Sequence, residues 1–376
     1  MTTTPKHLDV DGLLTDRATS IIVCCGSGGV GKTTAAAALA LRAAEQGRKV
    51  VVLTIDPARR LAQSLGLTEL DNNPRQVEGI DDGGRGGQLH AMMLDMQRTF
   101  DEIVEGHADP ERVQQILANP FYQSLSAGFS GTQEYMAMEK LGQLRRTGED
   151  TGSWDLIIVD TPPSRSALDF LDAPNRLGSF LDGRFIKVLT TPAKAGGGIA
   201  LKMLASGLSI ATLAMNKLLG SGLLTDVQTF VSALETMFGG FRQRADETYR
   251  LLQAEGTAFL VVAAPEPDAL REAAYFTERL AAEHMPLAGL ILNRVHRVAV
   301  PELSAERALS AAEELEDSDA GESADGRLAA GLLRLHAERV RLAGREKRLA
   351  DRFTATHPAV PVAEITAQPG DRKSVV

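Results

Sequence analysis

The sequence predicts an α/β fold with a doubly wound, mostly parallel sheet, and three observations lead to this prediction. Short apolar runs rich in β-branched residues alternate with longer stretches rich in alanine and leucine. The first two runs, with a helical stretch between them, have the pattern of a βαβ unit, which implies parallel strands. The 376 residues are 44% hydrophobic and 24% charged, so the chain can bury a full core.

Seven apolar runs are expected to form buried strands, because continuous apolar strands suit a sheet that helices cover on both faces. In chain order these runs are residues 20–25, 49–55, 89–94, 154–159, 257–264, 287–292 and 360–365. A helix is expected over residues 33–46, between the first two strands. Residues 1–17 lack the apolar segment of a signal peptide and are expected to be a frayed start.

A single domain is expected over residues 18–365, with a helical subdomain built from two insertions. The insertions, residues 96–148 and 171–255, are helical in pattern and contain no convincing strand. Within the second, residues 199–224 are apolar on nearly every side, which leaves open a buried core helix, a groove for an apolar client or an interface with a partner subunit. The acidic, glycine-containing stretch 313–326 predicts a mobile linker.

Charge and cysteine content narrow the classes of function. The chain has 40 basic and 49 acidic residues, a net charge of −9, which argues against binding nucleic acid. Its two cysteines, Cys24 and Cys25, are adjacent and are poor partners for a disulfide or a metal site. The longest uncharged apolar window, residues 203–216, is too short to span a bilayer. We therefore expect a cytoplasmic protein.

A glycine-rich motif gives the sharpest functional signal. The segment Gly26-Ser-Gly-Gly-Val-Gly-Lys-Thr-Thr34 fits the phosphate-binding P-loop pattern, between a predicted strand and a predicted helix. In such a loop the backbone wraps a triphosphate, the lysine reaches the β and γ phosphates, and the first threonine binds Mg²⁺. The motif predicts an ATP site with Mg²⁺ as cofactor, formed by Gly28, Gly29, Val30, Gly31, Lys32, Thr33 and Thr34.

Two aspartates at the ends of predicted strands complete this candidate site. Asp160 ends the run Leu156-Ile-Ile-Val-Asp160 and is expected to hold Mg²⁺ through water, as the second half of a P-loop site. Asp56 follows the second strand and is predicted to orient or activate the attacking water. A structural role for Asp160, or a helix-capping role for Asp56, stays open.

The order of these motifs resembles the family of arsenite-pump ATPases (ArsA) and GET-type ATPases that target tail-anchored proteins, with an actinobacterial branch nearest. The resemblance rests on the loop, on Asp56-Pro-Ala, on Asp160-Thr-Pro-Pro, on Pro265-Glu266 and on Ile291-Leu-Asn293, and covers roughly residues 21–365. It implies an ATP-driven dimer that opens and closes. It also implies that Asp56 is the catalytic carboxylate, that Asn293 reads adenine, and that Glu266 contacts nucleotide across the dimer.

Three departures from the family pattern qualify this resemblance. The family usually has a lysine at the second loop position, reaching the partner's phosphates, where this chain has Ser27. The positive charge at the partner's phosphates would then come from a paralogue that keeps the lysine or from an arginine such as Arg59 or Arg165, or it would be absent. The family's zinc-binding Cys-x-x-Cys is absent after Asn293, so no zinc is expected. Cysteines for an arsenite site are also missing.

The sequence thus leaves three functional hypotheses. The first is a dimeric, Mg²⁺-dependent ATP hydrolase whose cycle is coupled to an apolar client or a membrane partner, which would place it at the membrane periphery. The second is the nucleotide-binding half of a heterodimer with a lysine-bearing paralogue, weakly active alone. The third, a partition or positioning ATPase, ranks last because those enzymes are generally shorter and lack such insertions.

Overall fold

The computed structural model describes residues 6–56, 60–107, 110–119, 122–123, 132–162 and 243–368. Its strands are β1 (Ile21–Cys25), β2 (Lys49–Thr54), β3 (Arg75–Gln76), β4 (Gln88–Met93), β5 (Leu156–Asp160), β6 (Thr257–Ala263), β7 (Leu287–Val295) and β8 (Val362–Thr366). The helices are α1 (Val10–Thr15), α2 (Lys32–Glu45), α3 (Arg60–Ser64), α4 (Met96–His107), α5 (Pro110–Leu117), α7 (Thr132–Thr151), α12 (Pro267–Ala282), α13 (Ala305–Glu316) and α14 (Ala324–Thr356), with a 3₁₀ turn η2 (Asp319–Glu322).

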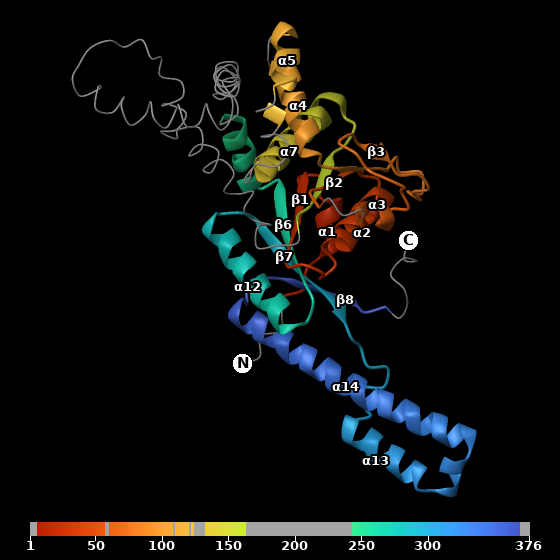
Figure 1. Ribbon diagram of the computed structural model, residues 1–376. Helices are drawn as coiled ribbons and strands as arrows, with labels where there is room; N and C mark the ends of the chain where they lie inside the picture. Colours follow the sequence, from red (N-terminus) through yellow and green to blue (C-terminus); the bar gives the residue numbers. More distant parts are fainter. Residues whose placement is uncertain are drawn as a thin grey trace, which may run out of the picture.

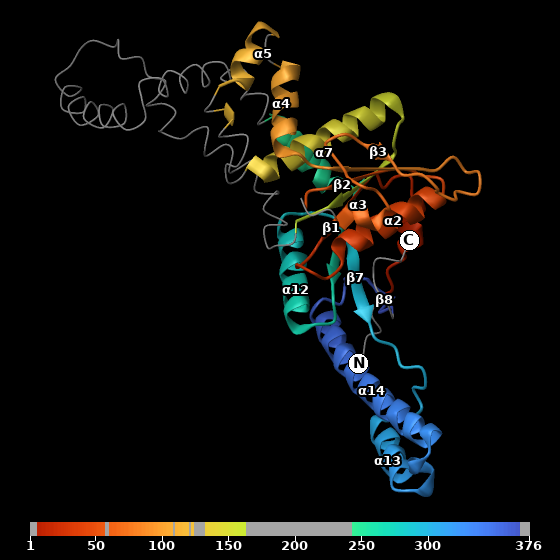
Figure 2. The same ribbon diagram turned by 45° about the vertical axis from the view of Figure 1, so that its right-hand side comes forward.

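The strands form one sheet in the order β3-β4-β2-β5-β1-β6-β7-β8. All neighbours pair in parallel except β3, a two-residue strand that pairs antiparallel with β4 at the edge. Figures 1 and 2 show α2 and α3 on one side of the strands and α12 on the other. This architecture is the doubly wound α/β fold that the sequence predicts.

The central strands are buried along their whole length. Every residue of β1, β5 and β6 is buried, since these strands are enclosed by neighbours and by helices on both faces. All seven predicted strands are found, with ends that differ by no more than three residues from the predicted ones. Cys24 and Cys25 are fully buried in β1 as free thiols. The carboxyl ends of β1, β2 and β5 therefore meet at one edge of the sheet.

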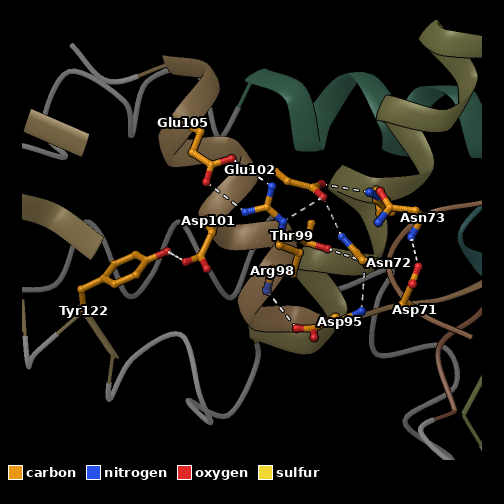
Figure 3. A network of polar contacts seen from close by, with 11 residues as sticks. Asp71, Asn72, Asn73, Asp95, Arg98, Thr99, Asp101, Glu102, Glu105 and Tyr122 are labelled. Atoms are coloured by element: carbon orange, nitrogen blue, oxygen red, sulfur yellow. Dashed lines mark hydrogen bonds and ion pairs between the residues drawn. The ribbon is translucent and has the colours of Figure 1, made fainter. Parts of the chain in front are cut away.

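The first helical insertion begins where β4 ends, and a polar network fixes its base (Figure 3). The Oδ1 of Asn72 accepts from the Asp95 backbone N–H at 3.0 Å and from the Thr99 hydroxyl at 3.1 Å. The Asn72 amide donates to Glu102 on α4 at 3.1 Å, and Lys140 on α7 donates to the same carboxylate at 2.9 Å. One network thus joins the end of the sheet to both α4 and α7.

A buried ion pair connects the two insertions where they are described. Glu139 on α7 is almost fully buried, and its carboxylate accepts from Nε of Arg244 at 2.9 and 3.0 Å. Arg244 lies in the helix over residues 243–253, which leads toward β6. One subdomain built from both insertions stays a prediction. Most of the second insertion, including the apolar stretch 199–224, lies outside the described residues.

Two expectations about segments outside the central sheet are wrong. Residues 6–17 are not frayed: Leu8 and Leu14 are buried, and α1 is capped by Asp9, whose carboxylate accepts from the Gly12 N–H at 2.9 Å. The stretch 313–326 is not a linker either, because α13, η2 and α14 continue through it as a helical hairpin. Ser323 supplies the cap for α14 by accepting from the Gly326 N–H at 2.9 Å. Such caps stabilise helix starts even in acidic surroundings.

Candidate nucleotide site

The P-loop runs from the end of β1 to the first turn of α2, which begins at Lys32. Its glycines are required by close approach and by backbone conformation. Gly26 has φ +146°, and a Cβ there would lie 2.1 Å from the Val262 carbonyl oxygen of β6. Gly31 has φ +97°, and a Cβ there would lie 2.3 Å from the side-chain nitrogen of Asn293. Any larger residue at either position would displace the loop from the sheet.

The outer part of the loop faces open space. Gly28, Gly29 and Thr34 are exposed, whereas Val30 is buried and Thr33 is half-buried. A Cβ at Gly29 would meet nothing within 4 Å. The loop therefore has room beside the N-terminus of a 14-residue helix, whose first N–H groups and positive dipole end favour an anion. These residues fit a bound phosphate chain.

Lys32 folds back over the loop. Its side chain is buried, and Nζ donates to the Ser27 carbonyl oxygen at 2.8 Å. Burial lowers the pKa of Lys32, while the carboxylates of Asp160 and Asp56 oppose that shift. Both aspartates thus act electrostatically on the lysine, so the three side chains predicted from separate parts of the sequence share one site.

Asp160 ends β5 and is fully buried. Its Oδ2 accepts from the Thr54 hydroxyl at 2.9 Å, whereas Oδ1 is buried and has no hydrogen-bond partner in the part of the chain that is described. Burial raises the pKa of Asp160 to about 6, against the lowering effect of hydrogen bonds from Thr33 and Thr54. A buried carboxylate oxygen without a hydrogen-bond donor fits the hydrated shell of a hard cation.

Asp56 lies just beyond β2, buried, with Arg60 as an ion-pair partner at 3.5 Å. Its backbone N–H donates to the Thr54 hydroxyl at 3.2 Å, and that hydroxyl donates in turn to Asp160. Thr54 therefore links the two aspartates. The sequence analysis missed Thr54 and Arg60, although Thr54 could have been found as the last residue of a strand next to the site.

Asn293 comes from β7 and reaches the loop, because its amide nitrogen donates to the Val30 carbonyl oxygen at 2.8 Å. Glu266 is different: it is exposed, it precedes α12 without a side-chain cap, and no hydrogen bond or ion pair joins it to the described loop residues. Within one chain, the site thus includes Asn293 but not Glu266. Its expected role across a dimer stays a prediction.

Several other predictions fall beyond the described part of the chain. Arg59 and Arg165, named as possible substitutes for the missing loop lysine, lie outside it. Of the turn Asp160-Thr-Pro-Pro, Thr161 is placed and its hydroxyl donates to the Cys24 carbonyl oxygen at 2.8 Å. Among the described residues, no three His, Cys, Asp or Glu side chains are grouped to hold a metal ion. A cation here would therefore also need phosphate and water ligands.

None of the described helices combines the length and the hydropathy required to cross a bilayer.

Comparison with known proteins identifies the family to which this chain belongs. A family profile described as anion-transporting ATPase (ArsA ATPase) matches residues 19–317. ATPase GET3 of Podospora anserina is 26% identical over 290 residues, which are 76% of this chain and 76% of that protein. An ATPase ASNA1 homolog of Cryptosporidium parvum is 25% identical over 270 residues, 72% of this chain and 63% of that protein.

A third relative matches over a shorter region. The arsenical pump-driving ATPase of Acidiphilium multivorum is 30% identical over 159 residues, which are 42% of this chain and 26% of that protein. The chain thus spans about a quarter of that relative and somewhat under two thirds of the Cryptosporidium protein. Because the family profile covers most of the sequence and the loop, Lys32 and both aspartates share one site, the chain belongs to the ArsA family of ATPases, whose members hydrolyse ATP.

Proposed function

We propose that this chain is a Mg²⁺-dependent ATP hydrolase in which the loop 26–34 binds the triphosphate. Asp56 acts on the water that attacks the γ-phosphate, and Asp160 on the Mg²⁺ bound beside it. The observation that carries the proposal is the convergence of Lys32, Asp56 and Asp160 beside the N-terminus of α2. Asp56 and Asp160 lie at the carboxyl ends of β2 and β5, and Lys32 follows β1 through the loop, so the groups meet at the usual place for a ligand in an open parallel sheet.

Each residue has a distinct part in the proposed reaction. Lys32 leaves the Ser27 carbonyl and places its ammonium on the β and γ phosphates. Thr33 and Asp160 would hold Mg²⁺, which when bound would supply positive charge against the charge that develops on the phosphates. Asp56 orients the attacking water and accepts its proton. The ion pair with Arg60 and the link through Thr54 support the position of Asp56.

Asn293 is proposed to recognise adenine. Its amide nitrogen is already engaged by the Val30 carbonyl, which leaves the side-chain oxygen as the acceptor for a base. A 6-amino group can donate to that oxygen, whereas the 6-oxo group of guanine cannot. The hydrogen bond from Asn293 to the Val30 carbonyl oxygen would thus connect a bound base to the loop.

The proposal extends to a dimer whose nucleotide cycle is coupled to an apolar client or to a membrane partner. Its support is the family membership and the similarity to ATPase GET3, together with the ion pair that joins the helical insertions. Glu266 would contact nucleotide across that dimer. We place the protein in the cytoplasm, peripheral to membranes when it acts, without zinc. Nucleic acid and arsenite are not proposed as ligands, given the net charge and the burial of Cys24 and Cys25.

Steady-state ATP hydrolysis by the purified chain tests the enzymatic core of the proposal. Activity that requires Mg²⁺ and falls by at least about a hundredfold in Asp56→Asn and in Lys32→Ala is expected, because both side chains act on the transferred phosphate. Asp268→Asn, which changes a highly exposed carboxylate on α12, is the matched control and should leave the rate unchanged. A rate equal to wild type in both site variants would contradict the assignment.

Ser27 favours a second candidate, the nucleotide-binding half of a heterodimer. A serine hydroxyl cannot supply the cation that the family's loop lysine brings to the partner site. In that case the chain alone would be slow, and mixing it with its nearest lysine-bearing paralogue would raise the rate. Ser27→Lys would then increase the activity of the chain alone. Full activity without a paralogue, unchanged in Ser27→Lys, would reject the heterodimer.

A further inference from the structure

The hairpin of α13 and α14 projects from the body of the protein, at the end opposite to α4, α5 and α7 (Figures 1 and 2). The C-terminal part of α14 packs on α12, and Phe353 is buried in the main core. The N-terminal part packs on α13 around a small separate core of Ala305, Ala308 and Ala337. One side of this outer half of α14 is covered by α13.

The other side of the outer half carries a stripe of leucines. The side chains of Leu328, Leu332 and Leu335 are 64%, 57% and 56% exposed, and they are three of the six strongly exposed large hydrophobic residues in the described part of the chain. Spacings of four and three residues place them on one face of the helix. Leu342 follows Leu335 at a seven-residue interval, half-buried, so the stripe has the repeat of a coiled-coil seam.

Charge is distributed unequally along the same hairpin. Residues 313–325 include seven acidic residues and no basic one. Beyond the leucines, the segment 339–348 contains five basic residues, which are Arg339, Arg341, Arg345, Lys347 and Arg348. The exposed leucines therefore lie between the acidic segment 313–325, called here the acidic tip, and the basic segment 339–348, called here the basic shaft.

We propose that the leucine stripe is a docking face for a second copy of this chain, with the two α14 helices antiparallel. A two-fold axis between Leu332 and Leu335 would pair each with the other in the second copy. Leu328 would then face the aliphatic stem of Arg339, and Asp325 would lie beside Arg341 and Arg345. Each acidic tip would thus meet a basic shaft, with apolar contacts between them.

Charge complementarity favours this arrangement over the alternatives. A parallel pair would place acidic tip on acidic tip and basic shaft on basic shaft, so both ends would repel. An anionic lipid surface would be repelled by Asp325, which precedes Leu328 by three residues and lies on the same face of α14. The antiparallel pair also leaves the ion pair between Glu316 and Arg334 intact, because that contact lies within one hairpin.

Cysteine cross-linking of the nucleotide-free protein tests the orientation. The native Cys24 and Cys25 are fully buried, so introduced thiols can be addressed selectively. Leu328→Cys and Arg339→Cys are prepared separately and treated with a short bismaleimide, alone and after mixing. We expect covalent dimer only in the mixture. Equal cross-linking of each variant alone would indicate a parallel pair and overturn the proposal, as would no covalent dimer in any sample.

Sedimentation equilibrium tests whether the leucines hold the pair together. The double variant Leu332→Glu with Leu335→Glu should raise the dimer dissociation constant at least about tenfold, because two carboxylates would enter the centre of the contact. Tyr275→Glu, which changes another strongly exposed large side chain, on α12, should leave the dissociation constant unchanged. Circular dichroism checks that both variants fold. Association equal to wild type in the leucine variant would refute the proposal, and omission of nucleotide separates this result from any failure of the proposed ATPase.

Discussion

The guanidinium of Arg48 is expected to be the strongest single polar anchor of the N-terminal segment. Its side chain is 1% exposed, and it donates to the Asp155 carboxylate at 2.6 Å. It also donates to the carbonyl oxygens of Leu14 at 2.8 Å, Asp16 at 2.9 Å, Thr19 at 2.8 Å and Asp155 at 3.1 Å. One side chain thus supplies all five of these hydrogen bonds between α1, the start of β1 and the start of β5.

Replacement by methionine removes every one of these donors while keeping most of the apolar stem. The carbonyl oxygens of Leu14 and Thr19 accept in fully buried contacts, and each would lose its partner at a cost of about 1 to 3 kcal/mol. Asp155 is partly exposed and retains a contact with Arg17, so its carboxylate can be hydrated and adds less. The sum is about 3 to 5 kcal/mol, the usual range for a broken buried ion pair.

Urea unfolding followed by circular dichroism measures this free energy. Arg48→Met should lower the free energy of unfolding by about 3 to 5 kcal/mol, and Arg48→Lys should recover only part of it, since one ammonium cannot replace a fork of five donors. Arg42→Met is the matched control: its pair with Asp11 is more than half exposed on both sides, so its loss should change the free energy of unfolding far less. Equal effects of Arg48→Met and Arg42→Met would refute the reasoning.

Three further outcomes are expected. In metal-free and nucleotide-free protein, Asp160→Asn should raise the free energy of unfolding by about 3 kcal/mol at pH 8, measured by urea unfolding, and the gain should vanish by about pH 4. The sign follows from the raised pKa of about 6, because stability present below the unfolded pKa is lost as pH rises through 6. Gly31→Ala should weaken binding of a fluorescent ATP analogue at least about tenfold, since φ +97° and the Asn293 amide leave no room for a Cβ; unchanged affinity would contradict this. Glu139→Gln should cost about 2 to 4 kcal/mol in wild type and clearly less in an Arg244→Met background, as a double-mutant cycle would reveal; strict additivity would exclude coupling.

The sheet was predictable because each of its longer strands has a recognisable local sequence pattern. Runs such as Lys49–Thr54 and Leu156–Asp160 are β-branched, apolar and bounded by turn residues, and their burial follows from helices on both faces. The two-residue strand Arg75–Gln76 and the six-residue helix Val10–Thr15 are too short for any periodicity. The hairpin through 313–326 was missed because its composition resembles a linker, although Ser304 and Ser323 both cap helices there.

Only part of the nucleotide site could be predicted in the same way. The loop motif located Lys32 and Thr33, and the strand-end rule located Asp56 and Asp160, since both follow from local pattern and parallel topology. The contact between Asn293 and Val30 joins residues from distant parts of the chain, and only the fold brings them together. Thr54 is similar, because a threonine at a strand end has no special signature until Asp160 lies beside it.

The pairing of His7 with Val362 has a consequence for synthesis on the ribosome. The Leu8 N–H donates to the Val362 carbonyl oxygen at 3.1 Å, so the first described residues complete the sheet at its last strand. During translation this segment emerges long before its neighbour in β8, because the two are far apart in the sequence. In that interval contacts such as those of Arg48 can hold the segment, and its pairing with β8 follows late in synthesis.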